Sequence, residues 1–262
     1  NGGPSRFYQF FLTRVSNNTT IPFFHIANDG NLLPNPIQVN STLIAVAERM
    51  DIIVDFTNIP EGTEIWLENR LRQTNGAGPD DSLFSAGQGN KVLKFKVVAG
   101  AVNDQSVNPA TKTSQALGGQ PYFYRVPTRQ STNFERCFNF DRENGQWVIN
   151  DQVFDCDDVR FKVRRNTAEI WELEGGRDWQ HPIHIHFEEH QIIERNRNQP
   201  TAVERGRKDV VRLGEGDKVR LFFRFRDFVG RLPLHCHNVV HEDHAMMVLG
   251  EIDDVGDNRT QP

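Results

Sequence analysis

Short segments in which apolar and polar residues alternate recur along the whole chain, and they predict β-strands. The segments are rich in Val, Ile, Phe and Thr and are bounded by Gly, Asn, Asp and Pro, whereas apolar residues at helical spacing are nearly absent. Turn signals occur at 28–30 and 58–62. The first set of predicted strands covers 5–15, 21–27, 42–56, 63–69 and 91–98. This set predicts one β-sandwich that lacks its first strand.

A second set of strands begins at residue 134. The segment before it, 101–133, is rich in Gly, Pro, Ser, Thr, Asn and Gln and poor in periodic apolar residues, as interdomain connections are. We therefore predict an all-β chain with two tandem β-sandwich domains, 1–100 and 134–262, joined by a linker at 101–133. Because a strand begins so close to residue 1, we expect a processed or truncated product. The later strands are predicted at 134–141, 146–151, 159–166, 168–175, 181–187, 189–196, 209–214, 218–225 and 231–237.

Composition and charge place the chain among ordinary globular proteins. Its 262 residues are enough to bury a substantial core, and 37% are hydrophobic and 25% charged, with a net charge of −5. Basic residues are interspersed with acidic ones, which argues against a nucleic-acid-binding surface. The longest apolar runs have the length of strands, so no membrane span is predicted. The first residues lack the pattern of a secretory signal, so we expect any such signal to have been upstream of them.

The chain has three cysteines, so at least one of them has no disulfide partner within the chain. Cys236 lies between two histidines, which favours a metal thiolate. Cys137 and Cys156 are either a disulfide pair or two buried thiols, and we favour buried thiols.

Eight of the nine histidines lie in the second predicted domain, in two motifs that define two faces. The first motif is His-Pro-Ile-His-Ile-His at 181–186, and the second is His-Cys-His at 235–237. Because side chains two residues apart on a strand share a face, His184 and His186 lie on one side and His181 on the other. By the same parity, Cys236 points away from its two flanking histidines. The sequence predicts two sites, back to back.

The two sites differ in chemistry. Cys236 and His181, joined by His241 and Met246 from the following loop, form the ligand set of a blue-copper electron-transfer site with Met as the weak axial ligand. The other site holds only imidazoles, which suit copper, zinc or iron. The backbone of Cys236 is a short covalent bridge between the two sites.

Three segments resemble multicopper oxidases, particularly bilirubin oxidases and bacterial spore-coat laccases. HCHNVVHEDHAMM at 235–247 resembles the terminal copper motif, GRKDVVRLGEGDKV at 206–219 the segment before it, and AERMDIIVDF at 47–56 a strand of the middle domain. The resemblance covers essentially the whole chain. It implies two cupredoxin-like, Greek-key domains that correspond to the second and third domains of the family.

The resemblance also implies a role for each motif residue. Glu242, next to a copper ligand, is a candidate proton relay to oxygen or else a surface residue, and His181 is the expected entry point of electrons, since an imidazole edge can face solvent. A complete enzyme holds four coppers, of type 1, type 2 and binuclear type 3. The implied ligands are His181, Cys236, His241 and Met246 for type 1 copper, His184 for type 2, and His186, His235 and His237 for type 3.

The chain lacks part of the family pattern. A complete member supplies four further histidines, in two His-x-His pairs, from its first domain. The only histidine here before residue 181 is His25, which we interpret as an ordinary strand histidine. We expect a missing first domain or another chain to supply the four ligands, so that this chain alone does not reduce oxygen. It is a fragment, one chain of a nicked or assembled enzyme, or a natural short form.

The implied activity is that of a laccase-like, copper-dependent oxidoreductase. One-electron oxidation of phenols, aromatic amines or tetrapyrroles at the type 1 copper is coupled to four-electron reduction of O2 to water. The alternative is a blue-copper electron-transfer protein with no oxidase activity, but such a carrier needs no histidines on both sides of Cys236. Copper nitrite reductases, also built from two cupredoxin domains, keep only one of those histidines. The expected location is extracellular or periplasmic. The physiological reductant, organism and oligomeric state do not follow from the sequence.

Four further residues near the motifs have two interpretations each. His190 and His244 lie off the ligand spacing, and we favour surface or second-shell roles. Asp209 either orients a loop near the type 1 site or starts a strand. Trp179 either shapes the approach of the reductant or is a packed aromatic.

Overall fold

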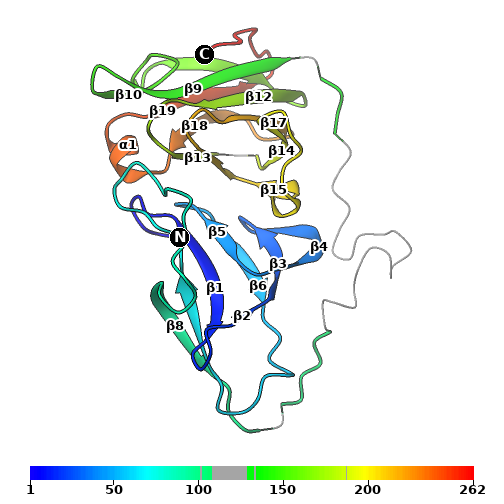
Figure 1. Cartoon of the computed structure of the whole chain (residues 1–262). Helices are drawn as coiled ribbons and strands as arrows, with labels where there is room; N and C mark the ends of the chain where they lie inside the picture. Colours follow the sequence, from blue (N-terminus) through cyan, green and yellow to red (C-terminus); the bar gives the residue numbers. More distant parts are fainter. Residues whose placement is uncertain (101, 108–128, 133, 187) are drawn as a thin grey trace. The chain divides into compact units, whose positions relative to one another are not determined.

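A computed structural model describes residues 1–100, 102–107, 129–132, 134–186 and 188–262 and divides the chain into two compact units (Figure 1). The first unit contains Asn1 and Arg6–Val126, and the second contains Gly2–Ser5 and Pro127–Pro262. The boundary at 126–127 and most of the predicted linker at 101–133 lie outside the described residues. The predicted domain limits therefore stay a prediction.

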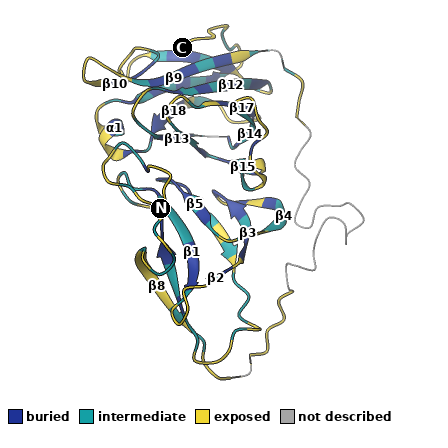
Figure 2. Cartoon of the chain, viewed as in Figure 1, coloured by how far each residue is buried: buried dark blue, intermediate teal, exposed yellow. Residues whose placement is uncertain are grey.

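The first unit consists of two β-sheets. One sheet has the order β2-β1-β7-β8 with β5 also paired to β1, and the other has the order β4-β3-β6. The edge strand β8 is exposed along most of its length (Figure 2). The strands are β1 (Tyr8–Arg14), β2 (Thr20–Ile21), β3 (Phe23–Asn28), β4 (Asn31–Val39), β5 (Thr42–Ile44), β6 (Met50–Ile53), β7 (Glu64–Asn69) and β8 (Asn90–Lys96).

Two features of this unit differ from the sequence prediction. The single strand predicted at 42–56 is divided into β5 and β6, which belong to different sheets, because Ala47 adopts a left-handed conformation with φ 67° between them. Strand β4 was not predicted, because it contains Pro34 and Pro36. Proline cannot donate to a β-ladder, and β4 accommodates two of them as the edge strand of its sheet.

The second unit is a β-sandwich of a six-stranded and a five-stranded sheet. The orders are β10-β9-β12-β17-β14-β15 and β11-β19-β18-β13-β16. A five-residue helix, α1 (Val239–Asp243), lies between β18 and β19, and a 3-10 turn covers Ala202–Arg205. The strands are β9 (Glu135–Glu143), β10 (Gln146–Ile149), β11 (Val159–Arg164), β12 (Ala168–Gly175), β13 (His181–Ile185), β14 (His190–Arg195), β15 (Arg207–Lys208), β16 (Val210–Leu213), β17 (Lys218–Arg224), β18 (Gly230–Cys236) and β19 (Met247–Asp253).

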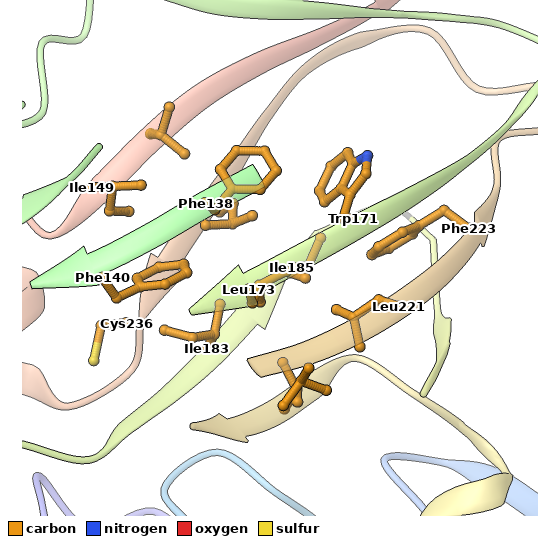
Figure 3. Close-up of a cluster of buried hydrophobic side chains, with 14 of the residues drawn as sticks. Phe138, Phe140, Ile149, Trp171, Leu173, Ile183, Ile185, Leu221, Phe223 and Cys236 are labelled. Atoms are coloured by element: carbon orange, nitrogen blue, oxygen red, sulfur yellow. The ribbon is translucent and has the colours of Figure 1, made fainter. Parts of the chain in front are cut away.

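One apolar cluster fills the space between the two sheets of this unit. The six-stranded sheet contributes Phe138, Trp171 and Phe223, and the five-stranded sheet contributes Ile183 and Ile185, all almost fully buried (Figure 3). Burying apolar surface of this kind contributes about 25 cal/mol for each Å². Cys236 and Met246 belong to the same cluster. The sequence prediction of an all-β sandwich is confirmed for this unit.

Strand β19 was not predicted, although its buried and partly exposed residues alternate perfectly. One of its inward positions is Gly250, which interrupts the apolar pattern because the ring of Phe161 occupies the space that a side chain would need. Among the described residues, neither helical segment is long and apolar enough to cross a membrane.

Candidate metal centre

The pairing of β13 with β18 brings the two histidine motifs together. The two strands are antiparallel, with Ile183 opposite Cys236 and His184 opposite His235. Residues opposite each other in such a pair point to the same face of the sheet. Cys236 therefore shares the inner face with Ile183, beside which it lies in Figure 3, and His184 and His235 share the outer face.

A first donor group forms on the inner face. The Nδ1 atoms of His181 and His241 are 3.2 Å apart, and the Sγ atom of Cys236 is 3.6 Å from the first and 3.5 Å from the second. A metal bonded to nitrogen at about 2 Å and to sulfur at about 2.3 Å, in a trigonal plane, requires donor separations of about 3.5 Å. The three atoms therefore fit one transition-metal ion.

The electrostatics of this group also favour a metal. Burial lowers the pKa of both His181 and His241 to about 3, so both imidazoles are neutral at pH 7 and have a lone pair to donate. Burial raises the pKa of the Cys236 thiol far above its ordinary value. A thiolate at this buried position therefore needs a cation beside it, and a bound metal ion supplies that charge.

The loop after β18 carries the remaining residues of this group. The Met246 amide donates to the carbonyl of His241 at 3.0 Å, and the Met246 carbonyl accepts from the amide of Cys236 at 3.1 Å. Asn238 caps α1, and Ala245 turns the chain with φ 72°. These bonds close the loop on itself and bury Met246 completely, whereas Met247 lies in β19 with partial exposure. Met246 as the axial ligand stays a prediction.

A second donor group lies on the outer face. The Nε2 atoms of His186 and His235 are 3.3 Å apart, and His184 offers a nitrogen within 4.8 Å of both. The ring of His237 lies 5.3 Å from that of His235 and 6.0 Å from that of His184, measured between centroids. Its Nδ1 is buried without a hydrogen-bond partner in the described part of the chain. The structure thus gathers the four histidines as strand parity predicts, while their metal assignments stay predictions.

Neighbouring oxygens orient two of these imidazoles. Nδ1 of His184 lies 3.0 Å from the carbonyl of Asp209, and Nδ1 of His235 lies 3.3 Å from the carbonyl of Cys236 and 3.2 Å from a carboxylate oxygen of Glu242. Because oxygen accepts in all of these contacts, each Nδ1 carries the proton and each Nε2 keeps its lone pair. This is the usual arrangement around metal-bound histidine. Asp209 directly precedes β16, as its interpretation as a strand-start residue requires, and its carbonyl orients a histidine of the second group and not a loop near the type 1 site.

Comparison of the sequence with known proteins identifies the family of this chain. A sequence profile described as multicopper oxidase matches residues 125–254. A bilirubin oxidase from Albifimbria verrucaria is 34% identical over 248 residues, which cover 91% of this chain. The chain belongs to the multicopper oxidase family. The predicted resemblance is confirmed.

Other multicopper oxidases are similar over nearly the whole chain. A laccase from Bacillus subtilis is 28% identical over 271 residues, covering 92% of this chain. The crystal structure of McoA from Aquifex aeolicus covers 97% of the chain with a TM-score of 0.80 at 24% identity. The chain spans 41% of the length of the bilirubin oxidase, 50% of the laccase and 54% of the McoA chain. It thus corresponds to about half of a known multicopper oxidase.

The structure corrects three expectations for this multicopper oxidase chain. His181 is only 1% exposed, so the premise that its imidazole edge faces solvent is wrong, and its role in electron entry stays a prediction. Cys137 and Cys156 are both free thiols and not a disulfide pair. Cys137 is partly buried, but Cys156 is exposed, so the expectation of two buried thiols is wrong for Cys156. His190 is fully buried against Phe223, because it lies inward on β14, so the surface role is wrong and the second-shell role stays a prediction.

The remaining residues near the motifs lie as follows. His244 is exposed at the end of α1, as one of its two interpretations requires. His25 is buried and contacts Asn28 at 2.6 Å, as expected of a strand histidine. Trp179 packs edge-on against Trp147 at 4.9 Å between ring centroids and is partly buried. Trp147 was missed, because a single tryptophan in an alternating strand carries no functional signal.

Proposed function

We propose that this chain is the part of a multicopper oxidase that takes up electrons from an organic reductant and provides half of the ligands of the oxygen-reducing site. The observation that carries the proposal is the convergence of His181, Cys236 and His241 back to back with a second group of imidazoles. Cys236 of the first group is bonded directly, through its two peptide bonds, to His235 and His237 of the second group. Copper, when bound, would supply one-electron redox chemistry at the first group and oxygen reduction at the second.

The residues of the first group exclude water and hold a single geometry. The two imidazoles and the thiol are almost completely buried, and the loop bonds of Met246 hold the helix carrying His241 against β18. A rigid, dry site of this kind favours electron transfer over direct chemistry on a substrate. We assign type 1 copper to His181, Cys236, His241 and Met246.

The residues of the second group suit the type 2 and type 3 positions. Here His184 would hold type 2 copper, and the other three histidines of the group would hold type 3 copper. Glu242 touches Nδ1 of His235 at 3.2 Å and is partly exposed, so it can hold a proton between solvent and this group. That position supports its proposed role as a proton relay.

A further domain or chain would complete the oxygen site. The described histidines provide four imidazoles on the outer face, and the family pattern requires four more. The share of the relatives that this chain spans supports a first domain as their source. We expect oxygen uptake only when those ligands are present, and an extracellular or periplasmic location for the complete enzyme.

Small organic donors are the proposed reductants. The relatives include proteins named bilirubin oxidase and laccase, which supports tetrapyrroles, phenols and aromatic amines. The chain has only three methionines, which does not favour a methionine-rich site for cuprous ions. A blue-copper electron carrier is the alternative, and the histidines on both sides of Cys236 argue against it.

Copper loading of the purified chain tests the proposal. We expect an intense thiolate-to-copper absorption in the wild type, its loss in Cys236→Ser, and its retention in Cys156→Ser, which removes an exposed thiol. A colourless copper-loaded wild type, or a coloured Cys236→Ser variant, would refute the type 1 assignment. Oxygen uptake by the chain together with its upstream ligands then separates an oxidase from a carrier.

A further inference from the structure

The imidazole of His241 has an unusual environment for a metal ligand. Metal-binding histidines generally donate their second ring N–H to an oxygen, as His184 does to the carbonyl of Asp209 and His235 to the carbonyl of Cys236. By contrast, Nε2 of His241 is buried and has no hydrogen-bond partner in the described part of the chain. Its helix, α1, has only five residues and cannot by itself hold a ring in place. Something other than a hydrogen bond must orient His241.

The indole of Trp147 occupies that role. It is stacked on the His241 ring with 3.6 Å between centroids and 24° between planes, and it is 3% exposed. Trp179 touches both rings edge-on, at 4.9 Å from Trp147 and 5.2 Å from His241. Offset and edge-on contacts of this kind contribute beyond the area they bury. The His241 ring is therefore held by aromatic packing.

A further contact holds the indole itself. Arg142 is the direct cross-strand partner of Trp147 in the β9–β10 hairpin. Its guanidinium lies 5.1 Å from the centre of the Trp147 ring, within the range of a cation–π contact. The hairpin thus fixes the indole, and the indole fixes the imidazole.

We propose that Trp147 is a positioning residue for the copper ligand His241, an inference that rests on the proposed type 1 site. The stacked indole keeps Nδ1 of His241 directed at the Sγ atom of Cys236, 3.5 Å away, and shields from water the face of the imidazole on which it stacks. Removing the stacking surface frees the ring to rotate about its χ angles. The copper affinity and the thiolate absorption then depend on residue 147, which supplies no ligand atom.

The experiment compares Trp147→Leu, which keeps an apolar side chain but no ring, with Trp147→Phe, which keeps a ring. Trp171→Phe is the matched control, because Trp171 is fully buried in the same unit and packs on other aromatic rings. Copper affinity is measured by competition with a chelator, and the thiolate-to-copper absorption spectrum of each copper-loaded variant is then recorded. We expect Trp147→Leu to bind copper about 10–100-fold more weakly with an altered spectrum. Trp147→Phe and Trp171→Phe should stay close to wild type.

A copper-free measurement separates this inference from the proposed function. In the chain with labelled histidines, proton NMR should show the His241 ring shifted upfield by the stacked indole, and Trp147→Leu should abolish the shift. Unchanged affinity and spectrum in Trp147→Leu would overturn the positioning role. A wild type that shows the upfield shift but binds copper without thiolate absorption would instead overturn the type 1 site.

Discussion

Replacement of Arg136 by methionine is expected to destabilise the second unit severely. The guanidinium of Arg136, in β9, is completely buried and donates to both carboxylate oxygens of Glu169 at 2.7 and 2.9 Å. It also donates to Asp257 at 2.9 Å and to the carbonyls of Lys162 and Arg259 at 2.7 and 2.6 Å. The side chain therefore connects β9, β11, β12 and the segment after β19.

The magnitude follows from what methionine leaves behind. Glu169 is only 5% exposed, and without Arg136 the indole of Trp171, at 2.8 Å, is its one remaining side-chain donor in the described part of the chain. Removing one partner of a buried ion pair costs about 3–5 kcal/mol, because the other charge stays buried without compensation. For a unit of this size, about 3–5 °C in Tm corresponds to each kcal/mol. We therefore expect the Tm to fall by about 9–25 °C.

Urea unfolding followed by tryptophan fluorescence measures this loss, because three of the four tryptophans lie in the second unit. The matched control is Arg165→Met, which breaks an exposed ion pair with Asp254 and should cost only about 0–1 kcal/mol. Adding Glu169→Gln to Arg136→Met should recover part of the loss, because it removes the buried charge. Equal and small losses in Arg136→Met and Arg165→Met would refute the reasoning.

Three further predictions concern acid stability, packing and copper. Burial raises the pKa of Glu204, but the charge of Arg195 and hydrogen bonding outweigh burial and hold the pKa below its ordinary value. Its stabilisation is therefore present above the ordinary pKa and is lost as the pH falls through the folded pKa, so Glu204→Gln should flatten the acid limb of unfolding free energy against pH. Gly250→Ala should cost about 1–3 kcal/mol in urea unfolding, because the new methyl group meets the Phe161 ring. Copper at 100 times its Kd should raise the free energy of unfolding by about 2.7 kcal/mol, and chelation or Cys236→Ser should remove this gain.

Each of these predictions has a control. Glu215 is exposed, so Glu215→Gln should leave the acid limb unchanged. Gly2 has open space where a side chain would lie, so Gly2→Ala should have no packing cost. Cys156→Ser should keep the copper-dependent gain. Identical behaviour of test and control variants would contradict the corresponding prediction.

The sequence was sufficient for features that depend on local periodicity. Alternation with a period of two places His184 and His186 on one face of a strand wherever that strand lies in the fold. The same parity turns Cys236 away from its neighbours. Positions that break the local pattern were predicted poorly: the prolines of β4 and Gly250 of β19 concealed strands that backbone pairing with β3 and β18 stabilises.

Only the tertiary structure decided how these local features meet. The register that sets Ile183 opposite Cys236 and the stacking of Trp147 on His241 both join residues more than fifty positions apart. The burial of His181 likewise depends on side chains outside its own strand, among them Phe140 and Trp147. Such contacts arise when two sheets pack and exclude water, and no local pattern specifies which side chains then touch. The sequence thus determined which residues can donate to a metal and on which side of a strand they lie. The packed sandwich decided that His181, Cys236 and His241 converge within 3.6 Å and that their imidazoles are buried and neutral.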